Sequence, residues 1–169
     1  MYRKLFFLTS FLLVLALAGT NTLFGAVVWE GRISSQDDDV EEQLPAGNMY
    51  NTSSDLEMPY EGTGKSTPQI IGMRFVEVKI PKGANVVNAY VEFTVDELKG
   101  GTEPVSLLVE GELSPNAAAF TTAANNVSSR TKTTATTVWT VVNWTTVGQK
   151  DKTPDLTSII REIINQNGW

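Results

Sequence analysis

The chain has 169 residues, with 13 Lys and Arg against 19 Asp and Glu, and it contains neither histidine nor cysteine. Its formal net charge of −6, without a basic cluster, argues against a binding surface for DNA, RNA or an anionic membrane. The missing residue types exclude Ser-His-Asp and Cys-His catalysis, the usual zinc sites and a disulfide scaffold. An ordinary hydrophobic core must therefore hold the fold together.

The N-terminus predicts export. Arg3 and Lys4 form a short basic region, and an apolar run follows from Leu5 to Ala18. Small residues at the end of this run fit the positions that a signal peptidase reads. The run has about 14 residues, fewer than the roughly 20 that span a bilayer as a helix. We predict a signal peptide at 1–18, a single module at 19–169, and no stable membrane insertion after cleavage.

An uncleaved anchor is the alternative to a signal peptide. It would have to continue through the apolar Val27 and Val28, but the polar Thr20, Asn21 and Thr22 interrupt it. Cleavage is therefore the favoured interpretation, and it implies a secreted or cell-surface protein.

The rest of the chain has the pattern of a β-rich protein. Apolar residues alternate over Val87–Asp96, and a period of two places them on one face of an antiparallel strand. Further strands are predicted at Ala26–Trp29, Gly47–Tyr50, Ile70–Ile80 and Val105–Val109. Strands at short intervals without βαβ alternation predict an all-β fold, an antiparallel β-sandwich of jelly-roll type.

One late amphipathic helix completes the predicted fold. Thr153 and Pro154 are typical of an N-cap and a first helical position, and Asn167 with Gly168 is typical of a helix stop. Between them, apolar residues recur at helical spacing: Leu156, Ile159, Ile160, Ile163 and Ile164. The stretch 114–137, rich in Ala, Thr, Asn and Ser, is predicted to be a long loop.

An acidic segment between residues 30 and 61 contains a single base, Arg32. Ca²⁺ takes six to eight oxygen ligands in flexible geometry, and two acidic loops side by side offer such ligands. The spacing does not match an EF-hand loop, and the alternative interpretation is a solvated acidic surface. The candidate ligands for a structural Ca²⁺ are Asp37, Asp38, Asp39, Glu41, Glu42, Asp55 and Glu57.

A set of aromatic residues is the candidate binding surface: Tyr50, Tyr60, Trp139 and Trp144. Exposed aromatic rings stack on the apolar face of pyranose rings, so this set favours a polysaccharide ligand. The alternative is that both tryptophans belong to the core. A carboxylate pair for glycoside hydrolysis, Asp96 with Glu97 or Glu110 with Glu112, is a third and weaker candidate, because no motif singles out a pair.

Several segments, in this order, resemble a family of secreted jelly-roll modules found in surface proteins and multidomain exported enzymes of marine and planctomycete-like bacteria. The resemblance covers nearly all of the chain after the predicted signal peptide, although each piece alone is common. The segments are Ser34–Glu42, Ser53–Glu57, Ile71–Phe75, Ile80–Ala84, Ala89–Phe93, Thr153–Thr157 and Asn167–Trp169. The resemblance also extends to the broader class of carbohydrate-binding and cell-surface sandwich modules.

This resemblance implies a non-catalytic binding or structural module and carries no catalytic motif. In such modules further apolar strands follow the helix, so we expect the chain to lack the final strands of its sandwich. Either it is a piece of a longer protein or a partner supplies a strand to the open sheet edge.

The leading hypothesis is therefore a secreted, non-catalytic module that binds a polysaccharide or cell-surface glycan, with a structural Ca²⁺. The alternative is a cell-surface or filament subunit that self-associates by strand exchange through an open sheet edge. A small glycoside-active enzyme comes third.

Overall fold

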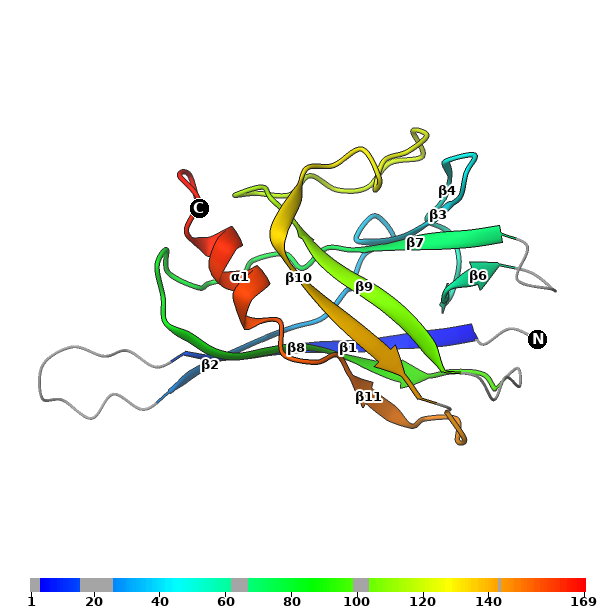
Figure 1. Ribbon diagram of the computed structural model, residues 1–169, viewed down its shortest axis with the longest axis horizontal. Coiled ribbons are helices and arrows are strands. Elements are labelled where there is room, and N and C mark those ends of the chain that lie inside the picture. Colours follow the sequence, from blue (N-terminus) through cyan, green and yellow to red (C-terminus); the bar gives the residue numbers. More distant parts are fainter. Residues whose placement is uncertain (1–3, 16–25, 62–66, 99–103, 143) are drawn as a thin grey trace, which may run out of the picture.

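The computed structural model describes residues 4–15, 26–61, 67–98, 104–142 and 144–169, which form mostly antiparallel strands and one short helix (Figure 1). This confirms the all-β fold class predicted from the sequence. In chain order the elements are β1 (Lys4–Leu15), β2 (Val27–Gly31), β3 (Asp39–Gln43), β4 (Asn48–Tyr50), β5 (Leu56–Glu57), β6 (Tyr60–Glu61), β7 (Thr67–Met73), β8 (Val86–Val95), β9 (Val105–Glu112), β10 (Lys132–Val141), β11 (Lys150–Lys152) and α1 (Thr157–Ile164).

The largest sheet is arranged around β8 and β1. Its strand order is β11-β8-β1-β2, and β5 also pairs with β1. The antiparallel register of β1 and β8 runs from Leu5 opposite Val95 to Leu15 opposite Val86. The other edge of β1 pairs with β2 and β5, and within the described residues neither of these pairs with another strand. β1 is thus the central strand of this sheet.

Two smaller sheets complete the strand pairing of the described residues. One has the order β4-β3-β7-β6, and the other is the antiparallel pair of β9 and β10. The β9–β10 pairing is irregular between Lys132 and Thr136. Figure 1 shows these two strands crossing the β8 sheet obliquely, with α1 beside them.

The main core lies between β8, β10 and α1. Ala89 and Phe93 from β8 are buried, and the Phe93 ring stacks on Trp139 of β10 with ring centroids 5.1 Å apart. Ile159 and Ile164 of α1 are buried in the same cluster. Because apolar area removed from water is the main favourable term in folding, this contact between strand, strand and helix fixes the centre of the molecule.

The helix packs so closely on β9 that Gly111 has no room for a side chain. A Cβ at this position would lie 2.7 Å from Cγ2 of Ile159 and 2.8 Å from Cδ1 of Ile163. The apolar stripe predicted for the helix therefore does face the core, as helical periodicity requires.

The element boundaries differ from the sequence prediction in several places. The strand predicted to reach Ile80 ends at Met73, and the loop predicted to extend to residue 137 becomes β10 at Lys132. The acidic segment, predicted as loop, forms β3 at Asp39–Gln43. The reason is that β3 pairs with β4 on one edge and with β7 on the other, so that long-range pairing overrides the local preference of Asp and Glu against strands.

The helix begins at Thr157, later than the predicted start at Thr153. The N-cap position is Leu156, which makes no side-chain cap hydrogen bond, so the prediction of Thr153 as N-cap is wrong. One residue before Leu156, Oδ1 of Asp155 accepts hydrogen bonds from the N–H of Thr157 (3.0 Å) and from the N–H of Ala89 (3.3 Å). The side chain of Thr153 instead accepts a hydrogen bond from the N–H of Val91 at 3.1 Å. Tertiary contacts with β8 thus decide where the helix starts.

The predicted signal peptide at 1–18 includes β1, and its removal after export stays a prediction. Within the described residues, no helix is long and apolar enough to cross a membrane.

Asp155 is expected to make stability depend on pH. Partial burial raises the pKa of Asp155, but hydrogen bonds from the hydroxyl and backbone of Thr157 and from Ala89, with the charge of Arg161, outweigh this effect and leave the pKa below its ordinary value of 3.8. A lowered folded-state pKa stabilises the protein above pH 3.8, and this stabilisation is lost as the pH falls through the lowered pKa. We therefore expect Asp155→Asn to lower the melting temperature at neutral pH and to lose this effect in strong acid. Thermal melts at a series of pH values measure it.

The matched control is Asp96→Asn, which removes an exposed carboxylate. An equal effect of Asp155→Asn at all pH values would contradict the role given to its charge.

Candidate functional site

Five of the seven predicted metal ligands lie inside the molecule, and three of them belong to the first acidic pattern. Asp38, Glu41 and Glu42 are 4, 3 and 0 % exposed, although carboxylates are rarely buried without partners. Asp38 forms an ion pair with Arg74. One oxygen of Glu42, Oε2, accepts hydrogen bonds from the N–H groups of Val127 and Ser128, both at 2.8 Å. These contacts compensate for burial of the charge.

The two acidic patterns meet where β3 approaches β5. The N–H of Glu57 donates to Oε1 of Glu41 at 2.6 Å, and both side chains are buried. Asp55 is also buried, and its Oδ1 accepts hydrogen bonds from the hydroxyls of Ser53 and Ser54 at 3.2 and 3.4 Å. The structure therefore brings Glu41 and Glu57 together, and the buried Asp55 lies two residues before Glu57.

The other two candidate ligands stay nearer to the surface. Asp37 is exposed, and its Oδ1 accepts a hydrogen bond from Nδ2 of Asn51 at 3.2 Å. Asp39 is half-buried; burial raises its pKa, the charge of Asp38 adds to this, and a hydrogen bond from its own backbone opposes it. Asp39 is thus a carboxyl group whose surroundings disfavour its charged form, whereas the pKa values of Glu92, Asp155 and Glu162 are lowered.

The seven candidate ligands do not converge on one point. Within the described residues, no three carboxylates form a group that holds a metal ion. One observation still favours an ion in this region, because Oδ2 of Asp55 is buried and has no hydrogen-bond partner among the described residues. Oε1 of Glu42, in the first of the two acidic patterns, is also buried and has no hydrogen-bond partner among the described residues.

The aromatic candidates separate into two groups. Trp139 and Trp144 are each 5 % exposed; the first stacks on Phe93, and the indole N–H of the second donates to Oδ2 of Asp151 at 2.9 Å. Tyr50, at the end of β4, is 44 % exposed, and Tyr60 in β6 is half-buried. The burial of the two tryptophans fits their alternative interpretation as core residues, because neither presents a ring face to solvent.

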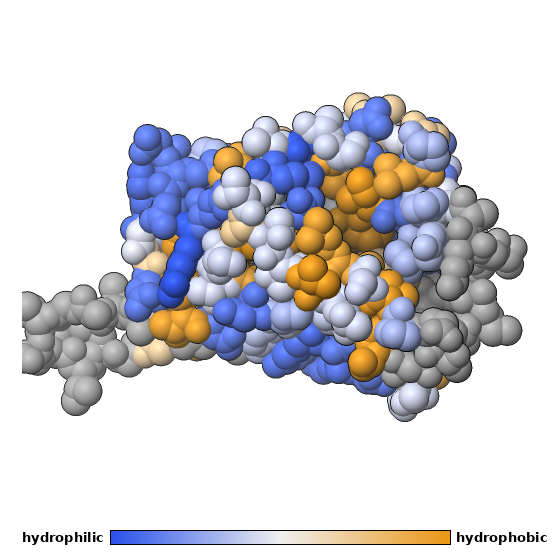
Figure 2. Space-filling model, in the orientation of Figure 1, coloured by the Kyte–Doolittle hydropathy of each residue, from blue (hydrophilic) through white to orange (hydrophobic). Residues whose placement is uncertain are grey.

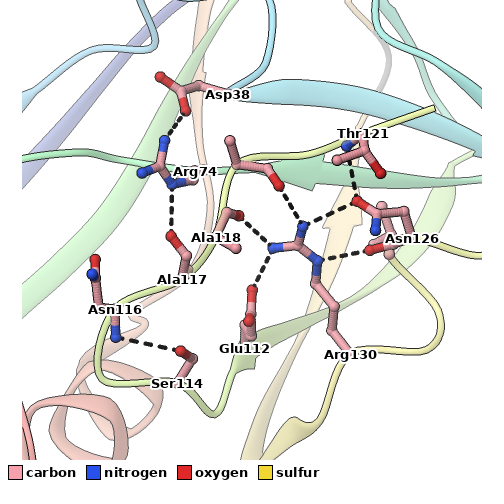
Figure 3. Close-up of polar contacts among 12 residues, drawn as sticks. Asp38, Arg74, Glu112, Ser114, Asn116, Ala117, Ala118, Thr121, Asn126 and Arg130 are labelled. Atoms are coloured by element: carbon pink, nitrogen blue, oxygen red, sulfur yellow. Dashed lines mark hydrogen bonds and ion pairs between the residues drawn. The ribbon is translucent and has the colours of Figure 1, made fainter. Parts of the chain in front are cut away.

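Sequence reasoning missed a pair of arginines that fasten the loop between β9 and β10 (Figure 3). The guanidinium of Arg130 donates to Glu112 at 2.8 Å and to the carbonyls of Ala118 and Ala119 at 2.8 and 3.0 Å, and it lies 4.3 Å above the centre of the Phe120 ring. The local sequence marks this cation poorly. Asn126, four residues earlier, is one partner, but Glu112 and the two carbonyls lie 18, 12 and 11 residues away.

Arg74 holds the same loop from the other side. Its Nε donates to the carbonyl of Ala117 at 2.8 Å while the guanidinium pairs with Asp38. Phe120 is thereby placed in a small second core with Val40 and Val127. The acidic strand β3 and the loop are thus locked together by charge and by apolar contact.

This locked loop borders an open, mostly apolar cleft of about 1130 Å³ between β7 and β9. Figure 2 shows a hollowed apolar area on this face of the molecule, between the positions of β7 and β9. Trp29, Met73 and Leu107 are among its apolar lining, and Ile160 and Ile163 of α1 contribute to it from the side.

Comparisons with known proteins add no relative: no family model, no curated protein and no solved structure matches this chain.

Glu42 gives a direct test of the buried carboxylates. Glu42→Ala leaves the buried N–H groups of Val127 and Ser128 without their acceptor and creates a cavity, so we expect a loss of about 2–4 kcal/mol in the free energy of unfolding. Denaturant unfolding measures this loss. Glu110→Ala, which removes an exposed carboxylate on β9, is the control. A change below about 0.5 kcal/mol for Glu42→Ala would contradict a structural role.

Proposed function

We propose that this chain is a non-catalytic module of the cell exterior, a jelly-roll-type sandwich that assembles with other copies by accepting an extended strand. The observation that carries this proposal is the cleft between β7 and β9. A face of a sheet is lined by alternate residues of a strand, whereas this cleft is lined by consecutive residues, Ser106–Glu112 of β9. Consecutive residues line a space when the edge of the strand borders it.

The wall formed by β7 presents backbone groups to the cleft. Backbone N–H and C=O groups point alternately to the two edges of a strand. The N–H of Arg74 donates to the carbonyl of Asp38 on the β3 side at 2.7 Å. Ile71 and Met73 lie three residues and one residue before Arg74. Their backbone N–H and C=O groups therefore point to the opposite edge of β7, toward the cleft.

The wall formed by β9 has the same property. The N–H of Gly111 donates to Oγ1 of Thr133 on the β10 side at 3.0 Å. The backbone groups of Leu108 and Glu110 therefore point to the other edge, which borders the cleft. Two facing strand edges above an apolar floor favour an extended polypeptide, because main-chain hydrogen bonds bind it and the floor buries alternate side chains.

Self-association gives the proposal a matched pair of variants. Leu107 is half-buried on the cleft side, and Leu108 is 60 % exposed on the outer face of the same strand. A charge that points into the space for a strand opposes pairing. We expect Leu107→Lys to abolish concentration-dependent oligomers and Leu108→Lys to leave them unchanged. Sedimentation velocity from micromolar to submillimolar protein measures this.

A wild-type protein that stays monomeric over the whole range would contradict assembly through the cleft. Equal effects of the two variants would also contradict it, because only one of them changes the cleft floor.

Polysaccharide binding is a second candidate function. It is supported by the exposed ring of Tyr50 and by the resemblance to carbohydrate-binding modules, and in this proposal Ca²⁺ is a structural ion near Asp55, where a buried oxygen lacks a hydrogen-bond partner among the described residues. Two of the four predicted aromatic residues are buried, so the geometry favours this function less than strand-mediated assembly.

Calcium and glycan binding are tested together. An ion that binds only the folded protein adds RT ln(1 + [L]/Kd) to stability, about 2.7 kcal/mol at a hundredfold excess over Kd. We expect millimolar Ca²⁺ to raise the melting temperature, EDTA to reverse this, and Asp55→Asn to remove it. A glycan array in calcium, with Tyr50→Ala as the comparison, tests the ligand. A melting temperature that does not respond to calcium would contradict the ion site.

A further inference from the structure

The position of β1 cannot be left empty without taking the large sheet apart. β1 pairs with β8 on one edge and with β2 and β5 on the other. Within the described residues, β2 and β5 have no other strand partner. Removal of β1 would leave β8 paired with β11 alone, and it would leave β2 and β5 without a strand partner among the described residues. Unpaired backbone groups next to a core are costly, so this position needs a strand.

The strand that fills this position belongs to the segment predicted to be removed on export. Lys4–Leu15 lies within the predicted signal peptide at 1–18. Hydrolysis of the Ala18–Gly19 peptide bond by a signal peptidase consumes water and leaves a carboxylate on Ala18 and an amine on Gly19. After this step the β1 strand is no longer covalently attached to the sheet.

We propose that the position between β8 and β2 is an acceptor site for a β-strand of another polypeptide, and that Lys4–Leu15 occupies it only until the signal peptide is cleaved. The proposal rests on the predicted cleavage and on the pairing of β1. It concerns a different sheet from the cleft between β7 and β9.

The register of β1 defines the chemistry of the incoming strand. It must run antiparallel to β8 and match it from Val95 to Val86. Ala89, Val91 and Val95 are buried, so the residues opposite them lie on the core side and must be apolar.

The outer face of the same strand is polar. There Lys150 pairs with Glu92 at 2.7 Å, and Lys152 lies 4.0 Å above the centre of the Tyr90 ring. The residues of the incoming strand on this face can therefore be polar. An alternating strand fits, as it does in other cases of strand addition.

A separate polypeptide is a better donor than a second copy. Each cleaved copy lacks the same strand. β2 and β5 border the vacated position and are needed to pair with the incoming strand in their own copy, and the remaining described strands already lie in sheets. At this position one copy would therefore have to give up a strand of its own to complete the same sheet in another, so the pairs gained equal the pairs lost. In the cleft between β7 and β9 an exchanged strand instead meets two strand edges.

The test keeps the protein folded while it breaks the covalent connection. A specific protease site is inserted within residues 16–25 of the full chain, and the purified protein is cleaved there. A fluorescent peptide of residues 4–15 with a lysine tail for solubility is then added, and its incorporation is followed by anisotropy and native mass spectrometry.

Proline peptides provide the controls. Leu12 and Leu13 each lie opposite a residue of β8 and a residue of β2. Because consecutive N–H groups point to opposite edges, proline at one of these positions removes a hydrogen bond to β8 and proline at the other removes one to β2. Peptides with Leu12→Pro or Leu13→Pro should bind at least about tenfold more weakly. A Leu12→Ile peptide keeps the N–H and should bind like the original.

We expect the labelled peptide to enter and the proline peptides to fail. The proposal is overturned if the labelled peptide does not enter, if the proline peptides enter equally well, or if loss of residues 4–15 leaves the melting temperature unchanged. Dimers formed by the stripped protein would overturn the choice of a separate donor, and retention of residues 1–18 in the exported protein would overturn the cleavage step.

The same exchange is measured on the Leu107→Lys variant. The altered side chain lines the cleft and also packs against the apolar cluster that includes Val91 and Phe93 of β8. A thermal melt therefore first establishes that this variant folds cooperatively, and exchange at β8 should then be normal. Failure of assembly through the cleft can thus be told apart from failure of the β8 site.

Discussion

The structure depends on β8 having a strand on each edge and an apolar layer against its inner face. Val91, Phe93 and Val95 face the core, where Trp139 and α1 cover them. One edge is satisfied by β11 and by the segment that leads into α1, including the carboxylate of Asp155. The other edge is satisfied by β1. The placement of the helix, the completeness of the sheet and the proposed acceptor site all follow from these two edges.

A second constraint comes from buried charge. Asp38 is buried against the guanidinium of Arg74, and the backbone of the loop between β9 and β10 donates to one oxygen of the buried Glu42. Arg130 closes the same loop from the opposite end. This network holds the loop over β3 beside the cleft. Two of its members, Arg74 and Glu112, also line the cleft, so the proposed assembly surface depends directly on these ion pairs.

The sequence predicts well what depends on local periodicity. The alternation in β8 and β9 and the helical stripe of Ile159 and Ile164 are each visible within one segment, and each appears in the structure. It predicts poorly what depends on distant partners. Asp38 and Glu42 look like members of a solvated loop because the groups that bind them, Arg74 and the N–H of Val127 respectively, lie far along the chain.

The candidate site shows the same division. The two acidic patterns do meet, through Glu41 and Glu57, but no local signal shows that their side chains are buried. Likewise, a tryptophan suited to a sugar platform and one suited to a core look alike in sequence. The burial of both rings, together with the stacking of Trp139 on Phe93, distinguishes them.

Hydrogen exchange at single amides of β8 tests the central claim most directly. The N–H of Val91 donates to Oγ1 of Thr153 at 3.1 Å and that of Val95 to the carbonyl of Gln149 at 2.9 Å, so the N–H groups of Tyr90 and Glu92 point to β1. After residues 4–15 are cleaved and displaced, we expect the N–H groups of Tyr90 and Glu92 to lose protection while those of Val91 and Val95 keep it. Equal protection of all four amides before and after displacement would contradict it.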